Sequence, residues 1–137
     1  MKIIEYLLAV TLGVFLLVSE NAMATALAVD CATSPYDASQ GNIEPALMLI
    51  SVTDPNGGAV TGLDTRNFDI ALYAIDTGGT TSVASIVESA NEPGFYKVYI
   101  RPTYEATGWG KANYLIGVTV TNGSDRGSTA TNLMIED

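Results

Sequence analysis

The sequence contains no histidine, and Cys31 is its only cysteine. Without histidine, the chain cannot form a Ser-His-Asp or Cys-His catalytic set, and it lacks the nitrogen ligand that transition-metal sites commonly use. A single cysteine excludes an intramolecular disulfide, so we expect a free thiol or a bridge to another chain. We therefore predict a protein that is not an enzyme and that depends on its apolar core for stability.

Basic residues are also scarce in this chain. Six lysine and arginine residues stand against 15 aspartate and glutamate residues, which gives a formal net charge of −9. Binding to nucleic acid requires clustered basic side chains that displace counterions from the phosphates. The basic residues here are scattered along the sequence, and the composition therefore excludes nucleic acid as a partner.

Only one stretch is continuously apolar for more than a few residues, and it lies at the N-terminus. Lys2 precedes the charge-free run "YLLAVTLGVFLLV", and small residues follow in the patterns "AMA" and "ALA". This layout is typical of a secretory signal peptide, and the run is shorter than the ~20 residues that span a bilayer. We predict a helical leader over residues 1–24 (or 1–28), and hence a secreted, periplasmic or cell-surface protein.

Two other interpretations of the N-terminal region stay open. Glu5 weakens the basic start of a leader and resembles the glutamate at the head of the apolar run in type IV pilins, where that run is kept as a hydrophobic stem. In that case the segment would be a membrane anchor or a filament stem. The second alternative is lipidation of Cys31, although Asp30 stands where a lipobox has a small residue.

The residue pattern in the middle and at the end of the chain is typical of an antiparallel β protein. In "GFYKVYIRP", residues Tyr96, Val98 and Ile100 alternate with a second set that includes Lys97 and Arg101. Because a face with lysine and arginine must meet water, the first set points inward. Similar runs, separated by Gly, Pro, Asn and Asp, predict strands at 46–53, 67–76, 80–88, 95–101, 114–121 and 129–135.

No amphipathic helix separates these predicted strands, which favours an all-β antiparallel sandwich. Residues 25–43 are small, polar and rich in turn formers, and we expect an irregular lead-in there. The sandwich would then occupy residues 44–137.

Two segments carry a family resemblance. "ISVTDPNGGAVTGLDTRNFDI" and "PGFYKVYI" resemble the V-x-D-x-x-G-x-x-V-x-G-L…F corner and the P-G-x-Y-x-V strand of bacterial immunoglobulin-like domains from exported proteins. The resemblance covers about residues 50–100 and implies an immunoglobulin-like β-sandwich. Such domains serve as spacers, adhesion modules, fibre subunits and enzyme accessories, so the resemblance implies a fold and no particular activity.

Calcium is the one cofactor for which the sequence offers ligands. Asp54 and Asn56 in "TDPNG", with Asp125 in "NGSDRG", supply the oxygen atoms that this cation prefers. Asp-Pro-Asn-Gly is also an ordinary β-turn, in which the aspartate accepts hydrogen bonds from its own backbone. We favour the turn and expect no cofactor.

The loop "PTYEATGWGKANY" contains the only tryptophan, Trp109, together with Tyr104 and Tyr114. Exposed aromatic side chains can stack on sugars or anchor a protein partner, which makes these three residues candidates for ligand contact. Alternatively, Trp109 packs over the open end of the sandwich, and this second interpretation is favoured.

The sequence therefore predicts an exported, non-enzymatic binding or structural module, such as an adhesion domain, that contacts a protein or a surface ligand. Homo-oligomers belong to this class, and an uncleaved leader would be the only membrane contact. The alternative is a subunit of an extracellular filament or surface assembly. Such a subunit would assemble through a hydrophobic stem, or by donating the lead-in 25–43 as a strand to a neighbouring sheet.

Overall fold

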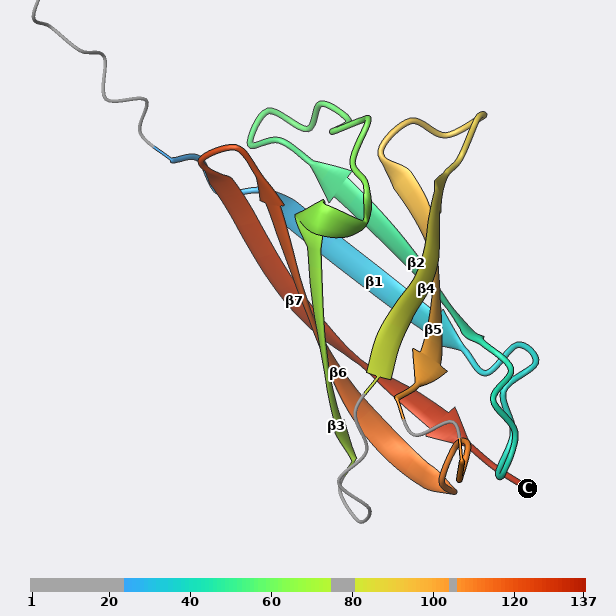
Figure 1. Ribbon diagram of the computed structural model, residues 1–137. Coiled ribbons are helices and arrows are strands. Elements are labelled where there is room, and N and C mark those ends of the chain that lie inside the picture. Colours follow the sequence, from blue (N-terminus) through green and yellow to red (C-terminus); the bar gives the residue numbers. More distant parts are fainter. Residues whose placement is uncertain (1–23, 75–80, 104–105) are drawn as a thin grey trace, which may run out of the picture.

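The computed structural model describes residues 24–74, 81–103 and 106–137 (Figure 1). Tyr104 and the predicted leader up to residue 23 lie outside the described residues. Within the described ranges, no helix is long and apolar enough to cross a lipid bilayer. The elements are β1 (Ala28–Ser34), β2 (Ala46–Thr53), the 3-10 turn η1 (Thr65–Asn67), β3 (Phe68–Ala74), β4 (Thr81–Glu88), β5 (Phe95–Pro102), β6 (Ala112–Asn122) and β7 (Asp125–Ile135).

The strands form two antiparallel sheets that lie face to face (Figure 1). One sheet has four strands in the order β1-β2-β5-β4, and the other has three in the order β3-β6-β7. All five strand pairings within these sheets are antiparallel. The predicted all-β, antiparallel, two-layered architecture is therefore confirmed.

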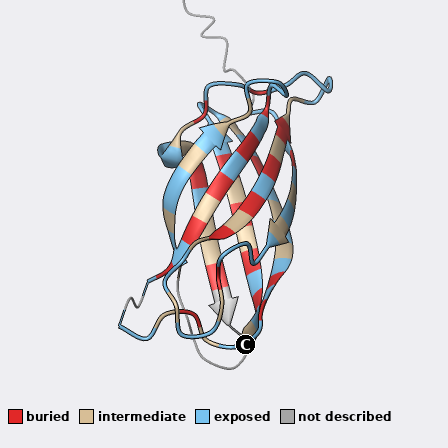
Figure 2. Ribbon diagram, turned by 90° about the vertical axis from the view of Figure 1, so that its right-hand side faces the viewer, coloured by how far each residue is buried: buried red, intermediate tan, exposed pale blue. Residues whose placement is uncertain are grey.

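The core lies between the two sheets because buried and more exposed residues alternate along the strands, most completely in β2, β5 and β6 (Figure 2). Tyr96, Val98 and Ile100 of β5 are at most 1% exposed, as the alternation predicted. Phe68 of β3 meets Tyr96 edge to face, with ring centroids 5.3 Å apart, and so joins the two layers. Burial of each large apolar side chain contributes about 1.5–3 kcal/mol, which makes this interior the main source of stability.

The prediction of an irregular lead-in is wrong for residues 28–34. They form β1, which pairs with β2 from Ala28 opposite Thr53 to Ser34 opposite Leu47. The apolar alternation of β1 is weak because the strand lies at the edge of its sheet, where only Val29 is buried. An edge strand needs fewer large apolar residues than a central strand, and its pattern is correspondingly harder to recognise.

The segment that leads into β1 also contacts the opposite sheet. The Leu27 amide donates to the Arg126 carbonyl at 3.0 Å, and the Arg126 amide donates to the Thr25 carbonyl at 3.2 Å. Gly127 permits this approach, since a Cβ there would overlap the Leu27 carbonyl oxygen. The N-terminal segment thus closes one side of the two-layered structure by contacting β2 in one sheet and β7 in the other.

The corner between β2 and β3 is fastened to the core by polar contacts. The Tyr96 hydroxyl donates to the Val60 carbonyl at 2.7 Å and accepts from the Leu63 amide at 3.4 Å. The Glu88 carboxylate accepts from the Gly62 amide at 2.9 Å and from the Gly94 amide at 3.2 Å. These bonds explain how a turn-rich segment acquires a fixed position over the end of the sheets.

Candidate functional site

Two of the three aromatic residues predicted as ligand contacts, Trp109 and Tyr114, do not face solvent. Trp109 is 1% exposed and Tyr114 is 2% exposed, and their ring centroids lie 5.7 Å apart in an edge-to-face contact. The Trp109 indole Nε1 donates to the Glu44 carbonyl at 2.7 Å. The contact interpretation is therefore wrong for Trp109 and Tyr114, whereas the favoured interpretation of Trp109 as a core plug agrees with its burial.

The three candidate calcium ligands take part in turn and strand contacts. Asp54 Oδ1 accepts from the Asn56 and Gly58 amides, both at 2.8 Å, in the turn that the sequence favoured. Asp125 Oδ1 accepts from the Thr25 amide at 2.8 Å and from the Thr25 hydroxyl at 2.5 Å, and these bonds lower the pKa of the Asp125 carboxyl. Across the residues that the structure describes, no three acidic or cysteine side chains gather as a metal site.

Among the described residues, three of the seven exposed large apolar side chains lie on the outer face of the four-stranded sheet. Leu49 of β2 and Phe95 of β5 are each 47% exposed, and Val87 of β4 is 54% exposed. The strand register places Leu49 and Val87 on either side of Lys97. We call this surface the outer face; its strand residues are Asp30, Ala32, Ser34, Leu47, Leu49, Ser51, Phe95, Lys97, Tyr99, Arg101, Ser82, Ser85 and Val87.

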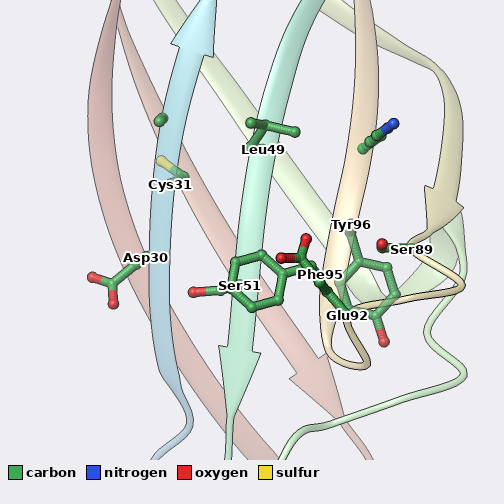
Figure 3. A pocket seen from close by; sticks show the side chains of 10 residues that line it. Asp30, Cys31, Leu49, Ser51, Ser89, Glu92, Phe95 and Tyr96 are labelled. Atoms are coloured by element: carbon green, nitrogen blue, oxygen red, sulfur yellow. The ribbon is translucent and has the colours of Figure 1, made fainter.

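A cavity of about 390 Å³ opens on the outer face, across β1, β2 and β5 (Figure 3). Its lining is mainly apolar and includes Leu49 and Phe95, and the acidic residues Asp30 and Glu92 also line it. Its volume is at the lower end of the range for binding pockets, ~300–1,000 Å³. The cavity is large enough to accept an apolar side chain from a partner.

Cys31 also lines this cavity, but its thiol has low reactivity. The thiol is free and half-buried, and its burial raises its pKa; the nearby Asp30 acts in the same direction, whereas a hydrogen bond with Thr131 opposes them. Because the thiolate is the reactive form, Cys31 stays a protonated thiol at neutral pH. The structure thus assigns it a packing position against β7.

Charge is distributed unevenly over the molecule. Arg66 pairs with Asp64 and holds the pKa of that carboxyl at about 2, and Lys111 pairs with Asp137. Within the described ranges, Lys97 and Arg101 of β5 form no ion pair. Two of the few basic residues of an acidic protein therefore lie on the same outer face without an ion-pair partner among the described residues.

The outward residues of β5 alternate between aromatic and cationic. Phe95, Lys97, Tyr99 and Arg101 follow one another on this side of the strand, and we call the four residues the ladder. Tyr99 meets the ring of Tyr36 edge to face at 6.1 Å. The sequence predicted the outward orientation of Lys97 and Arg101, but it treated them as an ordinary solvated face.

The outer face as a site was missed by reasoning from the sequence. The signal for it is in β2, where Leu47 and Leu49 point outward and alternate with the buried Ala46, Met48 and Ile50. A strand that is apolar on both sides exceeds what a one-sided core requires. Comparison of the chain with family models, with curated proteins and with solved structures finds no match.

Proposed function

We propose that this chain is an exported, non-enzymatic module of the immunoglobulin-like type that acts by contact with a protein or a surface ligand. The leader pattern supports export. The strand order β1-β2-β5-β4 and β3-β6-β7 supports the immunoglobulin-like assignment, since it corresponds to the ABED and CFG sheets of a constant-type domain.

The observation that carries the contact function is the composition of the outer face. It combines an apolar cavity, three half-exposed apolar side chains and two cations that form no ion pair with any residue in the described ranges. Interfaces are built around apolar and aromatic anchors with polar groups at the rim. A surface on which several apolar side chains are exposed close together marks an interaction site more often than a simple solvated face does.

The filament alternative receives less support from the described residues. Donation of the lead-in to a neighbouring subunit would require residues 28–34 to leave β2 of their own chain, with which they form a complete ladder of pairs. A hydrophobic stem would consist of residues outside the described ranges. We therefore place the contact module first.

Site-specific photo-cross-linking tests this function. A benzophenone amino acid would replace Leu49 on the outer face and, as a matched control, Leu115 on the outer face of the other sheet. The two leucines are 47% and 43% exposed, so they offer similar access to a partner. In the cells that produce the chain, we expect discrete adducts from position 49 and none from position 115.

Adducts from both positions, or from neither, would contradict the assignment of the outer face. The cell fraction that contains the chain tests export in the same experiment. Recovery of the chain only from the cytoplasm would contradict the predicted location.

A further inference from the structure

The ladder on β5 has a regular spacing that a partner can match. Successive members are two residues apart on one strand, which separates them by about 7 Å. From Phe95 to Arg101 the order is aromatic, cation, aromatic, cation. Lys97 has only Leu49 and Val87 as cross-strand neighbours, so the sheet itself supplies no carboxylate to it.

This order is complementary to itself when it is reversed. If a second ladder is laid antiparallel over the first, Phe95 faces Arg101 of the second copy and Lys97 faces Tyr99 of the second copy. Each aromatic ring then meets a cation, an arrangement that is attractive because the ring face carries partial negative charge. If the two ladders instead ran parallel, each cation would face the same cation of the second copy, and each ring would face the same ring.

The neighbouring strands fit the same arrangement. Leu49 shares a row with Lys97, and Leu47 shares a row with Tyr99. Reversal of the ladder therefore brings Leu49 opposite Leu47 of the second copy. On β4, Val87 comes opposite Ser85 of the second copy, so that a large side chain meets a small one.

The charges at the two ends of the outer face also match after reversal. Asp30 lies in the same row as Phe95, and Glu92 lines the cavity beside that residue. Arg101 lies six residues further along β5. In the reversed copy, Arg101 moves over the end that carries the carboxylates, where a cation is favoured.

We infer that the partner of the outer face is a second copy of this chain, packed face to face with its β5 strand antiparallel to the first. This inference rests on the proposed contact function, because it uses the same surface. The contact is isologous and therefore closes at two copies. Two stacked sheets with nearly aligned strands are a common packing geometry in proteins.

The size of the outer face predicts a weak dimer. Four strands at about 4.8 Å spacing and eight residues at about 3.3 Å each present about 500 Å². Two such faces bury about 1,000 Å², which is near the lower limit for a specific interface. We therefore expect a dissociation constant in the micromolar range.

Sedimentation equilibrium tests the dimer on the chain expressed from Met1 and purified without detergent. Between micromolar and near-millimolar concentrations, we expect the mass to rise from one copy to two and then to stay constant. Phe95→Arg would set cation against cation, and Arg101→Phe would remove a cation–ring contact. Phe95→Arg should weaken the dimer by about 10-fold or more, and Arg101→Phe should weaken it less, because two facing rings still attract each other.

Mixing the two variants gives the sharpest test. In a mixed dimer, the cation introduced by Phe95→Arg on one chain faces the ring introduced by Arg101→Phe on the other. At the opposite end, the unsubstituted Phe95 of one chain faces the unsubstituted Arg101 of the other. The double variant F95R/R101F is self-complementary for the same reason. Both the mixture and the double variant should therefore regain association close to that of the unsubstituted chain.

Leu49→Asp and Leu115→Asp form a matched pair of controls, of which only the first should abolish the dimer. Circular dichroism of every variant verifies that the fold is kept. A chain that stays monomeric throughout would overturn the inference, as would a mass beyond two copies, unaffected single variants, or a mixture that fails to associate. Adducts of a different protein at position 49 with a monomeric chain would leave the proposed contact function standing while the dimer fails.

Discussion

The indole of Trp109 links the loop before β6 to the chain segment before β2. Its Nε1 donates to the Glu44 carbonyl at 2.7 Å, and its ring is 1% exposed. Trp109→Phe would remove the donor and leave a small void, so we expect unfolding to become easier by about 1–3 kcal/mol. Urea denaturation followed by circular dichroism measures the change.

The fluorescence of Trp109 provides an independent check of the same contact. A ring inside the core emits at short wavelength and is protected from soluble quenchers. Emission at long wavelength that acrylamide quenches readily would contradict the buried position. A stability unaffected by Trp109→Phe would show that the hydrogen bond to Glu44 contributes little.

Because the Tyr96 phenol is buried, we predict that its ionisation lowers the stability of the protein at alkaline pH. This phenol is 1% exposed, and burial raises the pKa of Tyr96 above its ordinary value. A group whose pKa is raised on folding stabilises the protein fully below its unfolded pKa, which is about 10 for tyrosine, and loses this contribution at higher pH. Tyr96→Phe removes this titration together with the hydrogen bond to Val60.

At neutral pH, Tyr96→Phe should therefore be less stable than the unsubstituted chain by about 1 kcal/mol. Above pH of about 10 the difference should shrink, because only the unsubstituted chain has a phenol to ionise at this position. Denaturation midpoints at neutral and alkaline pH measure both values. A constant difference across this range would contradict the assigned role of Tyr96.

The sequence was enough to predict which residues of a strand face the core. It was not enough to predict which neighbouring strands surround the residues that face outward. The period of two placed Tyr96, Val98 and Ile100 in the core because Lys97 and Arg101 occupied the opposite face. The same reasoning gave no reason to single out Leu49, since its exposure depends on β1 and β5 as neighbours. Trp109 allowed two interpretations for a similar reason: the chain segment that buries it is distant in sequence.

At the scale of elements, the junction between β1 and β7 depends on a residue without a side chain. A Cβ at Gly127 would overlap the Leu27 carbonyl oxygen and come within 2.8 Å of Val29 Cγ2. Gly127→Ala should therefore push β1 away from β7 and destabilise the protein by about 1–3 kcal/mol. Thermal unfolding and amide exchange at Leu27 measure the effect.

Gly117 on β6 is the matched control for this prediction. A Cβ there would have its nearest neighbour, the Ala71 carbonyl oxygen, at 4.0 Å, which is ordinary contact distance. Gly117→Ala should leave stability unchanged or raise it slightly, because alanine restricts the unfolded chain. Equal losses in the two variants would show that the close approach at Gly127 is not the cause.

The approximate positions of β2 to β7 followed from the sequence, whereas β1 was not predicted. The predicted strand at 46–53 has the bounds of β2, and that at 95–101 ends one residue before β5 does. These are central strands whose inward residues are all buried and apolar, and most of them are large. In β1 only Val29 is buried, and the strand is held by its pairing with β2. Its own sequence therefore contains no pattern from which a strand could be predicted.

At the scale of the whole molecule, composition and turn chemistry were enough for the fold class but not for the order of strands. Gly, Pro, Asn and Asp between short apolar runs predict antiparallel strands, and two such sheets are present. The pairing of β2 with β5 joins residues about fifty positions apart. Such pairings are decided by how complete faces fit together, which a single sequence does not display.

The fold also distinguishes between the two predicted ends of the leader. Cleavage after Ala28 would remove Leu27, which is 7% exposed and belongs to the core, together with the contacts of Thr25 to Asp125. Cleavage after Ala24 would keep both. We therefore expect removal of the predicted leader to leave a chain that begins at Thr25, and intact mass spectrometry of the processed chain measures this directly.

Processing at this position would also create a new ion pair. The Thr25 nitrogen lies 2.8 Å from Asp125 Oδ1, and cleavage turns that amide into an ammonium group that is charged at neutral pH. Asp125→Asn should therefore lower the melting temperature of the processed chain more than that of the unprocessed chain. The pKa of Asp125 is lowered on folding, so its contribution is present at neutral pH and is lost as the pH falls through that value. The two processed chains should accordingly converge in stability in acid; an undiminished difference there, or a mature chain that begins at Val29, would refute this account of the N-terminus.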